Sequence, residues 1–179
     1  MRFKDIINES IIDTPKFKKW FGKSKITTNS NKPMIAVHTS MTKWTQVDMS
    51  KLRSSAVWGK GIYLSLSGKG SWKPVGNNIT MELYVKSENP LDITKPLDEK
   101  STKRLEKLIG RKLETVPLIT LENRYGSVIE GAKKAGFDSI IHDGPGSTGK
   151  HIVVFEPTQI KSATENNGNF DPNNKDITK

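Results

Sequence analysis

The sequence holds two stretches whose residue types and spacing could support chemistry on a bound ligand. His38 follows a short apolar run, and an imidazole can bond a ligand or move a proton near neutral pH. Further along, the string Gly-Lys-Gly-Ile-Tyr occupies residues 59–63, and glycines beside a strand let the backbone approach a ligand closely. Each signal has a structural alternative, because a lone histidine is more often a packed structural residue and Gly-Lys-Gly can be an ordinary turn. The string is not a Walker phosphate loop, since the four-residue spacer and the Gly-Lys-Ser/Thr ending are missing.

A third stretch lies late in the chain, where His151 begins an apolar run that ends at Phe155. This run predicts a strand followed by a polar exit. Three histidines without cysteine could bind a metal, but the spacings of 104 and 9 residues between them match no metal signature. We therefore predict no metal site, and we expect His142, which lies beside Asp143, to be structural.

Positive charge is concentrated in the first half of the chain. Residues 14–81 hold twelve basic residues and one acidic residue, Asp48, whereas residues 82–179 hold fifteen of each. The net charge of the whole chain is +10. Two explanations stay open: solubility, or attraction to a polyphosphate such as a nucleotide cofactor, a nucleic acid or both. If the second is correct, the affinity for that partner falls steeply with added salt.

Composition excludes several classes of protein. The 179 residues are enough for one domain, or for one domain with a tail. The lack of cysteine excludes disulfides, thiolate nucleophiles and cysteine-based zinc sites. No run of 18 apolar residues exists, and the first residues are charged where a signal peptide is apolar. We therefore expect a cytoplasmic protein that makes no use of a membrane.

The elements that must position these residues follow no regular strand–helix–strand repeat, which predicts an α+β fold. Apolar spacing and capping signals predict helices at 3–12, 14–22, 98–109 and 121–135. Strands are expected at 33–37, 61–66, 79–85, 137–142 and 151–155, with the last two paired. His38 would then follow the first strand, Tyr63 would lie in the second, and His151 would begin the last.

Composition also suggests how the chain is divided. We expect an N-terminal extension with a short helix at 1–13, a domain at 14–164 and a polar tail at 165–179. The tail is rich in Asn and Asp, so we expect it to be poorly packed.

In this order, the motifs resemble those of diphtheria-toxin-like ADP-ribosyltransferases. The poly(ADP-ribose) polymerases among them share the Gly-Lys-Gly-Ile-Tyr string, here preceded by His38 and followed by a late strand that leads to Gln159-Ile160. Three further segments are similar to the ADP-ribosyltransferase domains of phage polyvalent proteins: Phe-x-x-Trp-Phe-Gly at 17–22, Asn-Pro-Leu-Asp at 89–92 and the string at 154–170. The resemblance covers roughly residues 14–174.

The resemblance implies a split β-sandwich, in which two small antiparallel sheets hold NAD in a cleft. In the family, the histidine binds a hydroxyl of the adenosine-side ribose and the adjacent backbone binds the nicotinamide amide, which implies these roles for His38 and Thr39. The tyrosine stacks on the nicotinamide ring, which implies that role for Tyr63, with Gly61 beside it in the binding site. A second aromatic residue usually covers the other face of the ring about ten residues later, and Trp72 is the nearest candidate.

A glutamate often begins the family's late strand, where it contacts the ribose hydroxyls, and His151 occupies this place. A neutral histidine can bond a ribose hydroxyl but brings no negative charge. Glu156 is a poor substitute, because its odd spacing turns it to the other face of a regular strand, so Asp143 and Glu130 are the alternatives. Without this glutamate, the resemblance implies a mono-transferase or an inactive binder rather than a polymerase.

The function that the resemblance implies is transfer of ADP-ribose from NAD to a macromolecular acceptor, a protein or a nucleic acid, with release of nicotinamide. Such an enzyme must stabilise an oxocarbenium ion on the ribose, while its neutral leaving group needs no strong acid. A role as a phage or mobile-element effector is expected. Two other functions stay open: NAD hydrolysis with water as the acceptor, and a catalytically weak module that binds ADP-ribose or nucleic acid.

Overall fold

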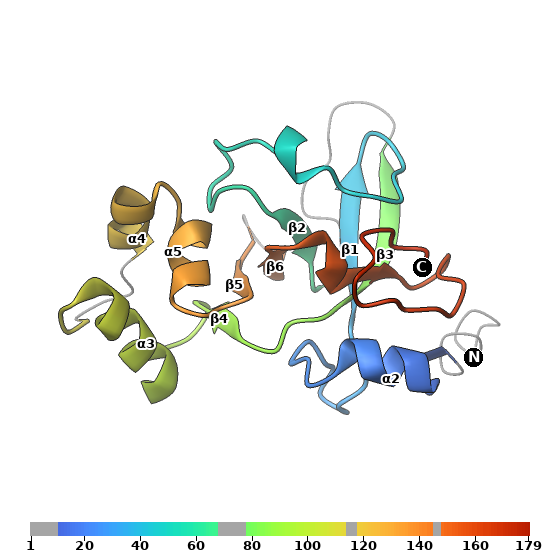
Figure 1. Ribbon diagram of the computed structural model, residues 1–179, viewed down its shortest axis with the longest axis horizontal. Coiled ribbons are helices and arrows are strands. Elements are labelled where there is room, and N and C mark those ends of the chain that lie inside the picture. The colour runs from blue at the N-terminus through green and yellow to red at the C-terminus, as the bar shows by residue number, and fades with distance from the viewer. Residues whose placement is uncertain (1–10, 68–77, 114–117, 145–147) are drawn as a thin grey trace.

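One sheet of seven strands forms the centre of the computed structural model, in the order β4-β5-β6-β2-β1-β3-β7 (Figure 1). The structure describes residues 11–67, 78–113, 118–144 and 148–179. Trp72 and nearly all of the helix predicted at 3–12 lie outside these residues. The strands are β1 Ile35–Ser40, β2 Ile62–Ser65, β3 Ile79–Val85, β4 Pro90–Asp92, β5 Ser139–Asp143, β6 Lys150–Val154 and β7 Ile160–Ser162. The helices are α2 Pro15–Phe21, α3 Glu99–Ile109, α4 Leu118–Tyr125 and α5 Val128–Lys134, with short 3-10 helices η1 Met49–Lys51 and η2 Pro157–Gln159.

The sheet has a seam between β1 and β2. β1 pairs with β3 over six residue pairs and β2 pairs with β6 over four, but the register between β1 and β2 holds the single pair Val37–Ser65. The expectation of two separate sheets is therefore corrected, because the two halves are joined into one sheet through this minimal contact. The sequence predicted no strand at β4, and β4 runs parallel to β5, whereas the resemblance implies antiparallel sheets. Apolar periodicity predicts a strand and its faces, but it does not say which strand edges meet.

Helices α3, α4 and α5 pack together beside β4 and β5 (Figure 1). Their apolar side chains form one buried cluster with those of β4, β5 and β6, and seven of its members are 0% exposed: Leu91, Leu105, Leu121, Ile129, Ala132, Ile140 and Val153. Asp98 begins α3 by accepting the backbone N–H of Ser101. None of the helices in the described residues is long and apolar enough to cross a membrane.

The single helix predicted at 121–135 is wrong, because the chain forms two helices, α4 and α5, in this region. Gly126 adopts a φ of +80°, a left-handed conformation that ends α4. Ser127 then caps α5, its hydroxyl accepting the backbone N–H of Glu130. The apolar periodicity continues across the break, so Gly126 and the capping residue Ser127 were the only local signals of it.

The C-terminal residues pack into the core, so the expected poorly packed tail is also wrong. Phe170 is 1% exposed and lies in an aromatic cluster with Trp20 of α2, their ring centres 5.8 Å apart. Ile177 is 2% exposed and joins the buried cluster formed by β1, β2 and β3. The segment is polar on average, so its composition did not indicate that Phe170 and Ile177 would be buried and would hold it against the core.

A buried lysine on β7 fixes the same segment. Lys161 is 0% exposed, and its Nζ donates to the backbone oxygens of Asn174 at 2.8 Å and Asp176 at 3.0 Å. The next residue, Ile177, donates its backbone N–H to the oxygen of Thr45 at 2.8 Å. The C-terminal segment thus braces the loop that follows β1.

Candidate functional site

The seam brings His38 of β1 against β2. His38 Nδ1 lies 2.8 Å from the backbone oxygen of Tyr63. Because a carbonyl oxygen only accepts, Nδ1 carries the proton and Nε2 is the acceptor of the neutral ring. Burial lowers the pKa of His38, and the bond to Tyr63 opposes this in part. Trp44 packs edge-on against the imidazole with ring centres 5.3 Å apart, so the ring is held in one orientation.

Tyr63 is held by the turn that precedes it. Its hydroxyl accepts the backbone N–H of Trp58 at 3.2 Å and donates to the oxygen of Gly59 at 3.0 Å. Its ring is half-buried and packs against the apolar cluster on the helix side of the sheet. Burial raises the pKa of Tyr63, although the bond from Trp58 opposes this, so the side chain is a neutral ring. The structure thus brings the His38 imidazole to the backbone of Tyr63, and a shared role of the two side chains in binding NAD stays a prediction.

The two glycines of the turn are required by packing within the protein. A Cβ on Gly61 would lie 2.5 Å from Val153 Cγ1 and 2.9 Å from Ile129 Cδ1. Gly59 has a φ of +108°, and its Cβ would lie 2.7 Å from that of Ser127. These contacts fit the turn tightly against α5 and β6. A role of Gly61 in binding a cofactor stays a prediction.

A row of polar side chains crosses three strands beside Tyr63. Ser65 of β2 lies opposite His151 of β6, which lies opposite His142 of β5. Opposed residues share one face of a sheet, and Tyr63, two residues from Ser65, shares it too. His151 is 4% exposed, its Nε2 lies 3.3 Å from Thr148 Oγ1, and its ring centre lies 5.6 Å from that of His142. Burial and the neighbouring His142 lower the pKa of His151, which keeps the ring neutral at pH 7.

Two of the three carboxylates weighed in place of His151 are paired with a lysine. Glu130 and Glu156 both form ion pairs with Lys133, at 3.7 Å and 3.1 Å. Asp143 is exposed at the end of β5, opposite Lys150. In the described ranges, no group of three or more His, Cys, Asp or Glu side chains is arranged to hold a metal ion.

Three buried side-chain polar atoms have no hydrogen-bond partner among the residues that the structure describes: Thr39 Oγ1, Trp58 Nε1 and His142 Nε2. Thr39 follows His38 on β1, and the rings of Trp58 and His142 lie 5.4 Å apart. Unpaired buried polar groups are rare because they are costly, and two of these three lie on neighbouring rings next to His151. Sequence reasoning missed Trp58, whose place directly before the glycine string was the available signal.

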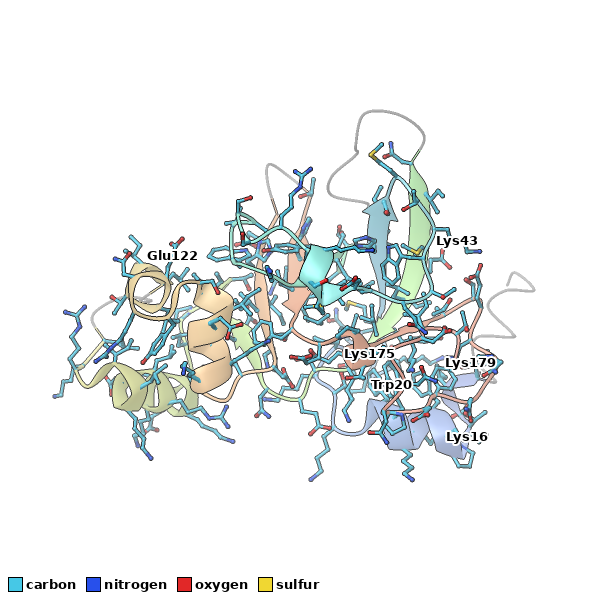
Figure 2. The ribbon with its side chains drawn as sticks, turned by 45° about the horizontal axis from the view of Figure 1, so that its top comes forward. Lys16, Trp20, Lys43, Glu122, Lys175 and Lys179 are labelled. Carbon is cyan, nitrogen blue, oxygen red and sulfur yellow. The ribbon has the colours of Figure 1, made fainter. Side chains whose placement is uncertain are left out.

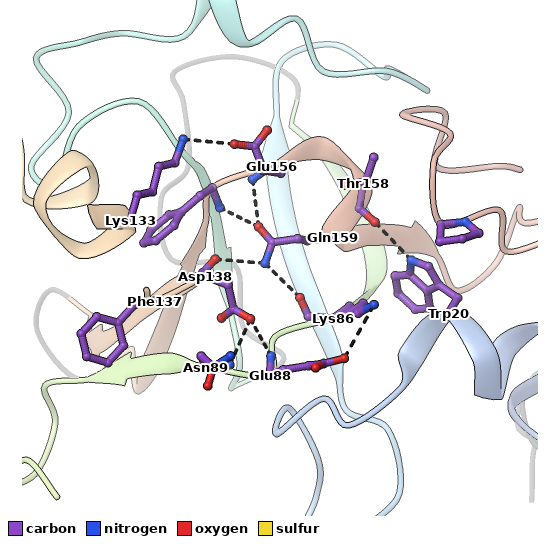
Figure 3. Close-up of a pocket in the computed structure, with 12 residues that line it drawn as sticks. Trp20, Lys86, Glu88, Asn89, Lys133, Phe137, Asp138, Glu156, Thr158 and Gln159 are labelled. Carbon is purple, nitrogen blue, oxygen red and sulfur yellow. Dashed lines mark hydrogen bonds and ion pairs between the residues drawn. The ribbon is translucent and has the colours of Figure 1, made fainter. Parts of the chain in front are cut away.

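A hollow of about 480 Å³ lies apart from these residues (Figure 3). It is lined by Trp20, Lys86, Glu88, Asn89, Lys133, Phe137, Asp138, Phe155, Glu156, Thr158, Gln159 and Pro172. None of the predicted site residues is in this lining. The hollow therefore gives no support to a cleft for NAD at this place.

Gln159 joins four backbone groups in the wall of the hollow (Figure 3). Its Oε1 accepts the N–H groups of Phe155 and Glu156, both at 2.9 Å. Its Nε2 donates to the oxygens of Lys86 and Asp138, both at 3.0 Å. One amide thus ties the end of β6 to the segments that follow β3 and precede β5. In the sequence, Gln159 stands out only as part of the family motif, and nothing there indicates the four hydrogen bonds that it forms.

The basic residues are distributed over several elements. Figure 2 shows Lys16, Lys43, Lys175 and Lys179 near α2 and the C-terminal segment, with Glu122 at the opposite end of the molecule. Some of the charge is neutralised locally, as in the ion pair of Lys43 with Glu165.

Seven strands in one mixed sheet and four α-helices in the described residues fit the fold of an ADP-ribosyltransferase. The model of one family, described as ADP-ribosyltransferase in polyvalent proteins, matches residues 29–170. The chain belongs to this family. No curated protein and no solved structure matches it.

The three histidines predict how stability depends on pH. Burial lowers the pKa of His38, His142 and His151 below the ordinary value of 6.5. Between 6.5 and those lowered values the unfolded chain binds more protons, so the free energy of unfolding falls as pH falls, by at most about 1.4 kcal/mol per pH unit for each histidine. Thermal melts between pH 7.5 and pH 5.5 should show this decline. A His151→Gln variant should reduce the slope, and a melting temperature that stays constant over this range would contradict the prediction.

Proposed function

We propose that the protein transfers a single ADP-ribose unit from NAD to a macromolecular acceptor and releases nicotinamide. The observation that carries this proposal is the contact of His38 with the strand of Tyr63 across the seam, in a chain that belongs to an ADP-ribosyltransferase family. The same proposal places its action in the cytoplasm and its biological role in a phage or mobile element.

In this mechanism, the seam binds NAD in a bent conformation. His38 Nε2 accepts a hydrogen bond from a hydroxyl of the adenosine-side ribose, since Nδ1 is already used by Tyr63. The backbone at Thr39 bonds the nicotinamide amide, and the unpartnered Thr39 Oγ1 is a second polar group at that position. The Tyr63 ring stacks on nicotinamide. As the C1′–N bond breaks, its electron pair stays on nicotinamide, which leaves as a neutral molecule.

His151 occupies the place of the family's glutamate. As a neutral ring on the face of the sheet that carries Tyr63, it would bond a hydroxyl of the reacting ribose. In the family, the glutamate also orients the acceptor, and a histidine at this place lacks the carboxylate that would position an attached ADP-ribose as the next acceptor. We therefore propose single units on the product rather than chains.

Incubation with labelled NAD and a cell lysate tests the function. Nicotinamide release together with label on protein or nucleic acid supports a transferase, and the mass added to the product gives the number of ADP-ribose units. Nicotinamide release without labelled macromolecule would instead indicate NAD hydrolysis. NAD binding without nicotinamide release would overturn both enzymatic functions.

A Tyr63→Ala variant should bind NAD more weakly by about 5- to 30-fold, since a lost ring stack costs roughly 1–2 kcal/mol. Tyr63→Phe is the matched control, because it keeps the ring and removes only the hydroxyl that holds the turn at Trp58 and Gly59. It should bind NAD nearly as wild type while melting at a lower temperature. Calorimetric titration with NAD measures the affinities, and an unchanged affinity of Tyr63→Ala would remove Tyr63 from the site.

A further inference from the structure

The pair Trp58 and His142 has a hydrogen-bonding capacity that the mechanism above leaves unused. Trp58 lies in the turn that leads into β2, and His142 lies on β5, with their ring centres 5.4 Å apart. Both side chains are half-buried, yet Trp58 Nε1 and His142 Nε2 are buried atoms without a partner in the described parts of the chain. Because His142 shares a sheet face with Tyr63 and His151, the pair lies beside the proposed site of reaction.

The protons on the rings of Trp58 and His142 determine which ligand group could form hydrogen bonds with both of them. His142 Nδ1 lies 2.9 Å from the backbone oxygen of Asp143, so Nδ1 carries the proton and Nε2 can only accept while the ring is neutral. Trp58 Nε1 can only donate. The group that fits both must donate and accept at once. This excludes a guanidinium, an ammonium and a carboxylate.

Among groups that both donate and accept, a hydroxyl is the better nucleophile, because the nitrogen lone pair of a carboxamide is delocalised. The loop that carries Trp58 favours a hydroxyl on a polyanion. Arg53 and Lys60 are exposed on either side of Trp58, and neither forms an ion pair with another described residue. Between them, Val57 is 75% exposed. Sites that bind single-stranded nucleic acid combine such cations with aromatic rings, and Trp58 is the aromatic ring here.

We propose that Trp58 and His142 bind the acceptor, and that the acceptor group is a ribose hydroxyl of RNA. This rests on the proposed transferase function. The hydroxyl oxygen forms a bond to C1′ of the nicotinamide-side ribose while the C1′–N bond breaks. The hydroxyl proton passes to His142 Nε2, which becomes an imidazolium and later returns the proton to water. Trp58 Nε1 donates to the attacking oxygen and orients it.

Two matched variants test the pair. Trp58→Phe keeps an aromatic ring and removes the N–H, while His142→Asn keeps a donor for the oxygen of Asp143 and removes Nε2. With total cellular RNA and labelled NAD, label on RNA should fall by about 10-fold in Trp58→Phe. It should fall by about 100-fold in His142→Asn, which lacks the base. The affinity for NAD should change much less than the label on RNA does. Ile119→Ala, at an exposed residue of α4, is the control and should change none of these readouts.

The position of the label completes the test. Digestion of the labelled RNA to nucleosides should place ADP-ribose on ribose. Label on a nucleobase, label confined to protein, or full labelling by both variants would overturn the inference while leaving the transferase function intact. An equal loss of NAD affinity in the two variants would also overturn it, because the pair would then belong to the NAD site. If wild type releases no nicotinamide under any condition, the proposed function itself fails.

Discussion

A Gln159→Ala variant is expected to lose about 3–5 kcal/mol of its free energy of unfolding. The side chain is 9% exposed and makes four hydrogen bonds, so its removal leaves the N–H groups of Phe155 and Glu156 and the oxygens of Lys86 and Asp138 without these partners. An unpaired buried polar group costs about 1–3 kcal/mol, and water entering from the adjacent hollow satisfies only part of the four. Denaturant unfolding followed by tryptophan fluorescence measures the loss.

Two further variants make this expectation specific. Gln159→Glu keeps an acceptor for the two N–H groups but presents a second oxygen to the two carbonyls, so it should also be strongly destabilised. Thr158→Ala leaves the backbone oxygen that Trp20 Nε1 bonds at 3.1 Å, and it should cost less than about 0.5 kcal/mol. If Gln159→Ala unfolds as Thr158→Ala does, the four bonds are not what holds this region together.

A His38→Ala variant is expected to lose ADP-ribosyltransferase activity by about 10²- to 10³-fold, the range typical of removing one positioned polar group from an active site. The change removes Nε2, proposed to bond the ribose, and also removes the bond from Nδ1 to the oxygen of Tyr63. The seam between β1 and β2 would then rest on the single pair Val37–Ser65. Nicotinamide release at saturating NAD measures the activity, and thermal melting measures the loss of the seam contact.

Asparagine and glutamine separate the two roles of His38. The amide nitrogen of Asn lies where Nδ1 lies, so His38→Asn should recover the melting temperature but not the activity. The amide of Gln reaches the place of Nε2, so His38→Gln should recover part of the NAD affinity while melting lower than wild type. Full activity in His38→Asn would mean that the histidine only joins the strands.

The parts of the fold that follow from local sequence were predictable. β3 has the predicted bounds, because alternating apolar residues define a half-buried strand, and the last two strands pair as expected. The link between His38 and Tyr63 came from the resemblance; the structure brings the His38 imidazole to the Tyr63 backbone, and a common NAD site stays a prediction. Contacts between distant segments were not predictable. No local pattern shows that Lys161 donates hydrogen bonds to the backbone of the C-terminal segment. Nor does one show that Gln159 donates to backbone oxygens in the segments that follow β3 and precede β5. In the same way, Trp58 Nε1 and His142 Nε2 become buried, without partners in the described ranges, only when the fold brings the turn before β2 against β5.

Because of the seam, the contact between β1 and β2 should open more readily than the strand pairs within each half of the sheet. Each half is held by a long ladder, so its amide hydrogens are protected by bonds that break together. Across the seam there is one register pair and one imidazole bond, and such a contact opens locally at a small fraction of the global unfolding free energy. A ligand bound to both His38 and Tyr63 adds its binding free energy to that local opening. Bound NAD would then link β1 to β2 where few backbone bonds join them, and amide hydrogen exchange in the two strands would slow together on NAD binding.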